Sequence, residues 1–311
     1  MKTVVLDGYA LNPGDLKWNW LSSFGEYEIY DRTEKSDVIE RCKDADFILT
    51  NKVVFDKEVI SALPKLKYIG ATSTGYNVID TAFAAEKGIT VTNVPAYSTD
   101  SVAQHTFALI LHYMSRVAVH NESVKKGDWC SCPHFMYTVK PLSDLSGKTL
   151  GIIGGGQIGS RVAEIGRVFG MNVLIYSRTK KEGYVEFDEV LSKADFISLH
   201  IPQTPQTEKI ICAETIAKMK DGVAIINTAR GGLVNEEDMY KALESGKVAF
   251  FGADVLSCEP PREDNPLLKA ENAVITPHIA WASFEARERL MNVLEDNMKA
   301  FVKGEKLNVV N

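Results

Sequence analysis

The segment TLGIIGGGQIG at residues 149–159 restricts the possible folds of this chain more than any other. Apolar residues run directly into a cluster of glycines, and a helical pattern follows, as in a buried parallel strand that turns straight into a helix. In such a turn Gly154 would allow the tight bend, Gly156 would let a ligand approach the backbone, and Gly159 would let the helix pack on the strand. The pattern predicts a dinucleotide-binding turn with a pyrophosphate at the helix N-terminus.

Three consecutive glycines also raise the chance that the match is accidental and that the segment is an ordinary strand-to-helix turn. The flanking residues favour the binding turn, because apolar side chains recur at helical spacing from Val162 to Phe169 and Gly170 is placed to end that helix. The residues of this turn that we expect to contact a cofactor are Gly154, Gly156, Gln157, Ile158 and Gly159.

Short apolar runs alternate with helical patterns on both sides of this segment. The first series is at residues 3–6, 27–30, 47–49, 68–71 and 89–93, and the second starts at 149 and continues at 173–176, 196–199, 224–227, 250–253 and 273–275. Such alternation predicts parallel sheets with helices on both faces. We therefore expect an α/β protein with two doubly wound, Rossmann-like parallel-sheet domains and a cleft between them.

The length of 311 residues, with 45% hydrophobic content, suits two such domains. The last helical pattern, at about 283–302, has no strand pattern after it, so we expect that helix to return to the first domain. The predicted domains are residues 1–97 with 286–311, a flavodoxin-like substrate-binding domain, and residues 98–285, a dinucleotide-binding Rossmann domain.

The stretch 101–120 between the two series has the pattern of one long helix that is apolar on more than one face, and an aromatic-bearing loop follows at 129–137. A helix that is apolar all round is usually buried. Its cover could be the core of its own domain or a second subunit, and we favour the second subunit. We therefore expect residues 101–145 to form a dimerisation helix and loop, and the protein to be a homodimer.

Charge and composition exclude several classes of protein. The net charge is −6 and the lysines are scattered, so no basic surface for nucleic acid is predicted. The N-terminus does not have the pattern of a secretion signal, and no apolar run is long enough to span a membrane. The five cysteines are odd in number and unpatterned, which suits reduced thiols. Cys130, Cys132 and His134 lack zinc-type spacing and a fourth ligand, so we expect a cytoplasmic protein without a metal.

Three charged side chains follow predicted strands of the second series, at the sheet edge where ligands of open α/β sheets bind. Arg230 follows the strand at 224–227, Glu259 the strand at 250–253, and His278 the strand at 273–275. A guanidinium that grips a carboxylate, an imidazole that moves a proton and a carboxylate that orients the imidazole make an acid–base dehydrogenase site.

Each of these residues alone could be an ordinary helix-capping, loop or turn residue, but their joint occurrence after the glycine turn favours catalysis. The remaining histidines have no comparable neighbours, and we interpret them as helix, core or loop residues. They are His105, His112, His120, His134 and His200.

The chain resembles the D-isomer-specific 2-hydroxyacid dehydrogenases along nearly its whole length. The resemblance is carried by four motifs in the family's order, at residues 154–159, 227–234, 254–260 and 276–280. It implies that Arg230, Glu259 and His278 are the catalytic residues. It also implies that backbone N–H groups of Ser73, Thr74 and Gly75 bind the substrate carboxylate together with Arg230, and that His278 contacts the substrate as well. Further cofactor-binding residues implied by it are Pro202, Thr207, Thr228, Ala229, Arg230, Asp254 and His278.

Within the family, residues 71–77 and 278–283 resemble glycerate dehydrogenases, also called hydroxypyruvate reductases. Glu259 argues against the family's formate dehydrogenases, which carry glutamine there and need no proton relay. The resemblance implies the reduction of hydroxypyruvate or glyoxylate to D-glycerate or glycolate. Alternatives are another D-2-hydroxyacid dehydrogenase, of the D-lactate or phosphoglycerate type, and a dinucleotide-sensing regulator similar to the corepressors that share this fold.

The end of the second strand of the Rossmann domain departs from the usual NAD pattern. An acid there would accept hydrogen bonds from the adenosine ribose, but this chain has Ser177, followed by Arg178 and Thr179. Serine does not repel a 2′-phosphate, and a guanidinium can pair with one. An ordinary solvated loop is the alternative. We therefore predict that NADP(H) is preferred and that NAD(H) is possible.

Overall fold

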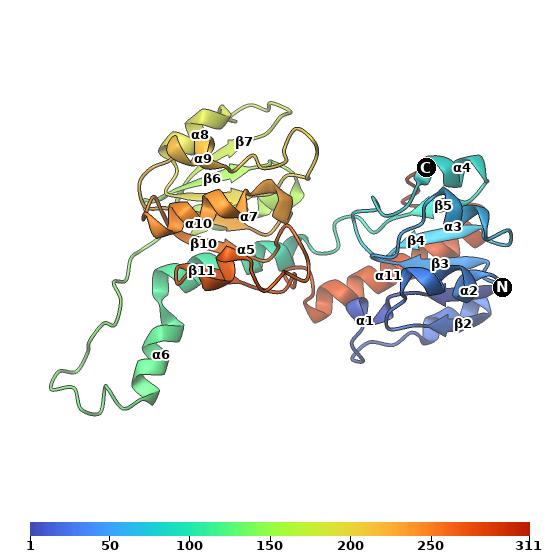
Figure 1. Ribbon diagram of the computed structural model, residues 1–311, viewed down its shortest axis with the longest axis horizontal. Helices are drawn as coiled ribbons and strands as arrows, with labels where there is room; N and C mark the ends of the chain where they lie inside the picture. Colours follow the sequence, from blue (N-terminus) through green and yellow to red (C-terminus); the bar gives the residue numbers. More distant parts are fainter. The chain divides into compact units, whose positions relative to one another are not determined.

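The computed structural model describes residues 1–311, and the chain divides into two compact units (Figure 1). Unit 1 comprises Met1–Ser98 and Ala282–Asn311, and unit 2 comprises Thr99–Trp281. The first boundary lies one residue from the expected position (98 against 97), and the second lies four residues away (281 against 285).

Unit 1 contains a five-stranded parallel sheet in the order β2-β1-β3-β4-β5. Its strands are β1 (Lys2–Val5), β2 (Glu26–Ile29), β3 (Phe47–Thr50), β4 (Tyr68–Ala71) and β5 (Thr90–Thr92). The central strands β3 and β4 are buried along their whole length, as their continuous apolar runs require. This strand order is that of flavodoxin-like sheets.

The helices of unit 1 include one from the far end of the chain. They are α1 (Gly8–Leu11), α2 (Val38–Cys42), α3 (Lys57–Ser61), α4 (Thr81–Glu86) and α11 (Phe284–Val302), with short 3-10 helices at Asn19–Phe24 and Lys35–Asp37. As predicted, α11 returns to the first sheet. The ring of Phe301 lies 5.6 Å from the ring of Phe47 and 5.1 Å from the ring of Tyr68, so aromatic packing fixes this helix on β3 and β4.

Unit 2 contains a six-stranded parallel sheet in the order β11-β10-β9-β8-β6-β7. Its strands are β6 (Thr149–Ile153), β7 (Asn172–Tyr176), β8 (Phe196–Leu199), β9 (Val223–Asn227), β10 (Val248–Ala253) and β11 (Ala273–Ile275). Every strand predicted in both series is present, so the doubly wound α/β class is confirmed. The strand order reverses between β6 and β8, which makes the end of β6 the expected ligand-binding point.

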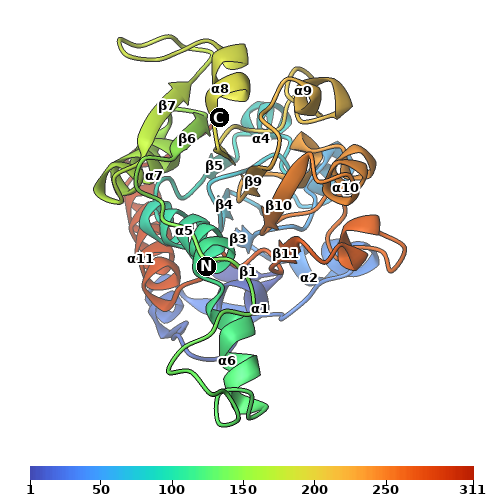
Figure 2. The same ribbon diagram turned by 90° about the vertical axis from the view of Figure 1, so that its left-hand side faces the viewer.

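Helices cover both faces of this sheet (Figure 2). They are α5 (Thr99–Ser115), α7 (Gln157–Val168), α8 (Phe187–Lys193), α9 (Ala213–Ala217) and α10 (Glu236–Glu244), with 3-10 helices at Gly231–Leu233 and Pro266–Lys269. A further helix, α6 (Val117–Lys125), follows α5. No helix is long and apolar enough to cross a membrane.

The prediction of one helix over 101–120 is wrong, because α5 ends at Ser115 and α6 begins at Val117. Arg116 between them has a left-handed backbone (φ 52°), and its guanidinium lies 4.5 Å from the ring centre of Tyr113. The expected cover of α5 is also wrong: Phe107, Ile110 and their neighbours are buried in the core of unit 2 itself. No second subunit is needed to bury α5.

The arm, which we define as residues 117–144, is the part of unit 2 that leaves its sheet. Figures 1 and 2 both show α6 and the following loop extending away from the strands. Large apolar side chains are exposed along it, including Val117 at 69%, Met136 at 54% and Phe135 at 90%. The apolar surface that lacks a cover therefore lies in the arm and not in α5.

Candidate active site

The glycine turn after β6 has a backbone that only glycine can form. Gly154 has a φ of +114°, and a Cβ atom there would lie 2.3 Å from the carbonyl oxygen of His200. A Cβ atom on Gly159 would lie 1.9 Å from the carbonyl oxygen of Gly154. Strand β8, the turn and helix α7 are therefore packed backbone to backbone, as the spacing of the glycines predicts.

The N-terminus of α7 suits an anionic ligand. Gly156 is its N-cap residue and has no side chain that could accept a hydrogen bond. The N–H groups at the start of the helix are therefore free to donate to a ligand. A Cβ atom on Gly156 would meet nothing within 4 Å, so a ligand has open space against the backbone there. These features fit the pyrophosphate of a dinucleotide, which would be held by the N–H groups near Gln157 and Ile158.

His278 and Glu259 form a direct pair. The Nδ1 atom of His278 lies 2.7 Å from Oε2 of Glu259, and both side chains are about one-third exposed, at 28% and 32%. An ionised carboxylate only accepts, so Nδ1 carries the hydrogen of this bond. The carboxylate thereby fixes the orientation of the ring and leaves Nε2 available for proton transfer.

Asp254, at the end of β10, holds the segment that contains His278. Its carboxylate is 1% exposed and accepts hydrogen bonds from the hydroxyl of Thr276 (2.6 Å) and the N–H groups of Ile279 (2.9 Å) and Ala280 (2.8 Å). The structure thus gives Asp254 a supporting role that its sequence motif does not indicate. Its contact with the cofactor stays a prediction.

Arg230 follows β9 in a short turn that is fixed by the strand's last residue. The side chain of Asn227 donates to the carbonyl oxygen of Arg230 (2.9 Å) and accepts from the N–H of Ala229 (3.1 Å). The Arg230 side chain is exposed, and one Nη1 hydrogen bond returns to Ala229 (2.7 Å). The backbone is therefore fixed, while most guanidinium donors are available to a carboxylate.

The other residues predicted to bind the cofactor lie on loops that follow strands of unit 2. Thr207 closes its loop by donating to the carbonyl oxygen of Pro202 (2.7 Å), and Thr228 bonds to the hydroxyl of Thr106 in α5 (3.0 Å). After β7, Ser177 is half-buried and Thr179 is exposed.

The basic residues of the loop after β7 differ in what they contact. Arg178 is exposed and makes no hydrogen bond or ion pair in the structure. Lys180, in contrast, forms an ion pair with Glu186, and the ammonium group of Lys181 lies 6.0 Å from the ring centre of Tyr184. Of these three cations, Arg178 is the one whose charge is uncommitted.

The predicted carboxylate-binding loop of unit 1 follows β4. Its hydroxyls turn toward the backbone, since Ser73 donates to the carbonyl oxygen of Gly75 (2.5 Å) and Thr74 to that of Val94 (2.8 Å). The N–H groups of Ser73, Thr74 and Gly75 donate no hydrogen bond within the chain. Three free N–H groups in a row are a donor set suited to a carboxylate.

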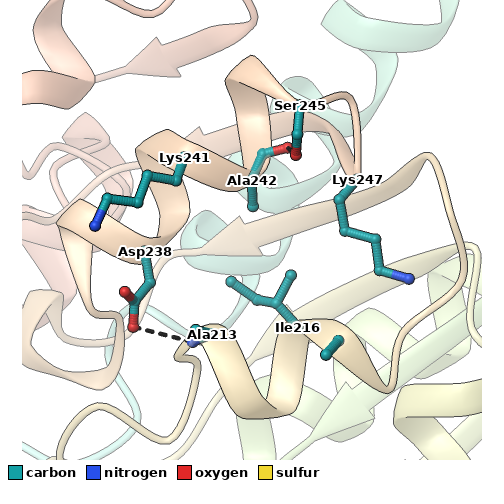
Figure 3. A pocket seen from close by; sticks show the side chains of 8 residues that line it. Ala213, Ile216, Asp238, Lys241, Ala242, Ser245 and Lys247 are labelled. Carbon is teal, nitrogen blue, oxygen red and sulfur yellow. Dashed lines mark hydrogen bonds between the residues drawn. The ribbon is translucent and has the colours of Figure 1, made fainter.

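A shallow groove on unit 2 contains none of the predicted site residues. It lies between α9 and α10, with Lys241 and Lys247 at its sides and Ile216 at its base (Figure 3). The N–H of Ala213 donates to Asp238 across it (2.9 Å). Asp238 and Lys241 belong to the surface of α10, and Lys247, which follows that helix, pairs with Asp221. No pair of the lining groups forms an acid–base or nucleophile–base arrangement.

Comparison with known proteins gives evidence on the function that is independent of this geometry. Residues 107–280 match the family described as D-isomer specific 2-hydroxyacid dehydrogenase, NAD binding domain. The chain belongs to the D-isomer specific 2-hydroxyacid dehydrogenases. It is therefore an oxidoreductase, and residues 107–280 lie within unit 2, so the prediction of a nicotinamide dinucleotide site in the second domain is confirmed.

Full-length relatives of this dehydrogenase agree with the assignment. The chain is 49% identical to "Hydroxypyruvate reductase" of Blautia hydrogenotrophica, with 100% of both chains covered. It is 38% identical to "Glycerate dehydrogenase" of Methylorubrum extorquens, covering 99% of this chain and 98% of the other. A solved acyclic imino acid reductase, in complex with NADPH and D-Arg, superposes with a TM-score of 0.87 at 33% identity over 100% of both chains.

His105, which the sequence predicts only as a helix, core or loop residue, is linked to the His278 segment. His105 of α5 lies 2.9 Å from the hydroxyl of Thr276, although 171 residues separate them. No spacing pattern relates the two positions, because their contact depends on how α5 is placed against the sheet.

Proposed function

We propose that this dehydrogenase reduces a small 2-oxo acid, hydroxypyruvate or glyoxylate, to D-glycerate or glycolate. The observation that supports this most is the 2.7 Å pair between His278 and Glu259 at the ligand-binding edge of the sheet. Such a pair supplies the proton that a carbonyl oxygen needs when hydride reaches its carbon. The names of the two full-length relatives favour hydroxypyruvate and D-glycerate as substrate and product.

In this mechanism the chain's own residues bind the acid and move one proton. The nicotinamide supplies the hydride when it is bound. Arg230 would grip the substrate carboxylate with two parallel N–H groups and polarise the carbonyl, and the free N–H groups of residues 73–75 would bind the same carboxylate. His278 would deliver the proton from Nε2 to the carbonyl oxygen, while Glu259 stabilises the imidazolium. In the oxidative direction the neutral imidazole would take the proton back.

We also propose that NADP(H) is the preferred cofactor. The half-buried Ser177 offers a hydroxyl where an acid would repel a 2′-phosphate, and the uncommitted guanidinium of Arg178 is next to it. The loops of Pro202, Thr207, Thr228 and Ala229 would complete the nicotinamide side of the site.

The arm is the proposed dimer contact. Its exposed apolar side chains, with Phe135 at 90% exposure, form the kind of surface that monomers rarely leave open. A two-fold homodimer would bury the same patch of both copies. Sedimentation of the parent and of a Phe135→Ser, Met136→Ser variant tests this, and an unchanged dimer in the variant would remove the arm from the interface.

The test of the reaction is a coupled pair of measurements on purified protein. Absorbance of the reduced nicotinamide should fall with hydroxypyruvate or glyoxylate, and screening both cofactors against a panel of 2-oxo acids ranks the substrates. His278→Ala should bind NADPH within a few-fold of the parent but lower turnover by roughly two to four orders of magnitude.

The outcome also separates the two classes of function. A parent that binds the dinucleotide but turns over no 2-oxo acid would favour the alternative of a dinucleotide-sensing regulator. A parent that is active while His278→Ala keeps most of its turnover would exclude His278 as the proton donor and leave the substrate assignment standing.

A further inference from the structure

The segment of residues 276–280 holds His278 in an unfavourable backbone conformation. His278 has a φ of +55°, in the left-handed region, which is sterically unfavourable for a residue with a Cβ atom. The N–H of His278 donates to the carbonyl oxygens of Asp254 (2.8 Å) and Thr276 (3.0 Å). Such a conformation persists only where surrounding contacts determine it, so the residues that hold this segment bear on the position of the imidazole.

Asp254 is the near side of that support. Its carboxylate accepts the three hydrogen bonds described above, and its carbonyl oxygen accepts the N–H of His278. An isolated buried carboxylate is costly, so its donors must be kept in place. Because the donors include the hydroxyl of Thr276, anything that orients this hydroxyl also orients the segment.

Helix α5 is the far side. Ser101 donates its hydroxyl hydrogen to the carbonyl oxygen of Ala280 (2.6 Å), and Nε2 of His105 lies 2.9 Å from the hydroxyl oxygen of Thr276 and 3.6 Å from Asp254. Ser101 and His105 are four residues apart and so lie on one face of the helix. That face contacts the segment at both of its ends, on either side of His278.

The direction of the His105 hydrogen bond follows from its neighbours. The carboxylate of Asp254 only accepts, so the hydroxyl hydrogen of Thr276 is used in their 2.6 Å bond. The hydroxyl oxygen must then accept from His105, which requires a hydrogen on Nε2. His105, Thr276 and Asp254 therefore form a chain of donors that ends on the buried carboxylate.

We propose that His105 is a positioning residue of this dehydrogenase. It acts through Thr276 and Asp254 to keep residues 276–280 where the imidazole of His278 meets Glu259. The proposal rests on the proposed function of His278 as proton donor. His105 itself is 19% exposed and contacts Thr276 and Asp254, not Glu259, so its effect reaches the reaction only through the segment.

The test compares two substitutions at one position. His105→Leu fills the space without a donor, whereas His105→Gln keeps an N–H near the place of Nε2. We expect His105→Leu to lower kcat for hydroxypyruvate by about 10- to 100-fold, the cost of a misplaced catalytic group, with the Kd for NADPH within about three-fold of the parent. His105→Gln should recover most of kcat. His112→Leu is the matched control, because His112 is exposed on the same helix and stacks on Phe250.

A second pair of variants tests the hydrogen bond between His105 and Thr276 from the other side. It also replaces the first test if His105→Leu fails to fold. Thr276→Val removes the hydroxyl at constant shape and should lower kcat like His105→Leu, while Thr276→Ser should stay close to the parent. If the two residues act as one chain, the double variant His105→Leu, Thr276→Val should be no slower than the slower single variant.

The outcomes are separable from those of the proposed function. A parent without turnover on any 2-oxo acid would contradict the proposed reaction, and with it the role of His105 in that reaction. An active parent whose His105→Leu and Thr276→Val variants keep parental kcat would overturn the role of His105. Equal loss in His105→Leu and His105→Gln would also overturn it, since packing and not the hydrogen bond would then be responsible.

Discussion

Unit 1 and unit 2 are built on parallel sheets whose strand order reverses after the first strand. The reversal lies between β1 and β3 in unit 1 and between β6 and β8 in unit 2. In open sheets of this kind the gap between the diverging chain segments is where ligands bind. The two units fill that gap in opposite ways.

In unit 1 a side chain of the protein fills it. Asp7 stands just beyond β1 and accepts hydrogen bonds from the N–H groups of Asn51 (2.9 Å) and Lys52 (2.6 Å), the first residues after β3. The helix that follows, α1, has only four residues. The backbone donors that could bind an external anion are thus used by the chain's own carboxylate.

In unit 2 the same place is left to a ligand. Gly154 follows β6 and lies against His200, the first residue after β8, whose N–H donates to the carbonyl oxygen of Ile153 (2.7 Å). The hydroxyl of Tyr184 reaches the turn and donates to the carbonyl oxygen of Gly155 (3.3 Å), but no carboxylate accepts from the turn, and the 12-residue α7 begins there without a side-chain cap. Strand order is common to both units, so it is the residues of the first turn that decide which sheet takes a dinucleotide.

The largest effect is expected from closing the turn of unit 2. Gly154→Ala combines a positive φ with a Cβ atom 2.3 Å from the His200 carbonyl oxygen, so the turn must move. We expect the Kd for NADPH to rise by at least about 100-fold, since misplaced helix donors lose the phosphates. Isothermal calorimetry on the folded variant measures this.

Gly246→Ala is the matched control for that variant. Gly246 also has a positive φ, +75°, but a Cβ atom there would meet nothing within 4 Å. Its substitution should cost about 1–2 kcal/mol of stability from the backbone alone and leave the Kd unchanged. Equal weakening of NADPH binding by both variants would show that strain, and not the close approach at the turn, causes the loss.

The next effect concerns the second strand of unit 2. If the exposed guanidinium of Arg178 pairs with a 2′-phosphate, Arg178→Ala should lose about 1.5–3 kcal/mol of NADPH binding and leave NADH binding nearly unchanged. Lys180→Ala is the control, because Lys180 is already paired with Glu186. A parent that prefers NADH, or a variant that weakens both cofactors equally, contradicts the proposed cofactor preference.

The sequence was sufficient for the sheets because the strands are continuous apolar runs between turn residues. Strands such as β8 and β9 are buried at every position, so their sequences are almost continuously apolar and are easily recognised as strands. The helix break at Arg116 was not predicted, because no glycine or proline marks it. Its left-handed backbone accompanies a contact with Tyr113 that depends on the tertiary fold.

The site divides in the same way. The glycine turn is a local structure, so its spacing predicted the close contacts of Gly154 and Gly159. The motifs also predicted that His278 and Glu259 would pair. The support of His278 by Ser101 and His105 was out of reach, because those contacts join residues 179 and 171 positions apart.

Lowering the pH should change the free energy of unfolding through both gaps, in opposite directions, and the larger change is expected from unit 2. Burial lowers the pKa of His200 from 6.5 to about 3, so the folded protein holds this imidazole neutral. Its contribution to stability is complete above pH 6.5 and is lost as the pH falls from 6.5 to about 3, because the unfolded chain binds the proton more tightly. We expect His200→Gln to reduce the loss of unfolding free energy between pH 7 and pH 5 by about 1–2 kcal/mol. Equal pH slopes in parent and variant would contradict a lowered pKa of His200 in the folded protein.

An effect of similar size is expected from removing the internal anion of unit 1. Asp7→Ala leaves the N–H groups of Asn51 and Lys52 without their acceptor, which should cost about 1–2 kcal/mol at pH 7, since water can replace part of it. Burial also raises the pKa of Asp7 above its usual 3.8, against the hydrogen bonds that lower it. The folded protein therefore binds this proton more tightly than the unfolded chain, so Asp7 contributes more stability as the pH falls toward 3.8, the opposite of His200. Denaturant unfolding of parent and Asp7→Ala at pH 7 and pH 4.5 should show a difference that widens in acid. If the difference in unfolding free energy narrows in acid instead, hydrogen bonding and not burial dominates the pKa of Asp7.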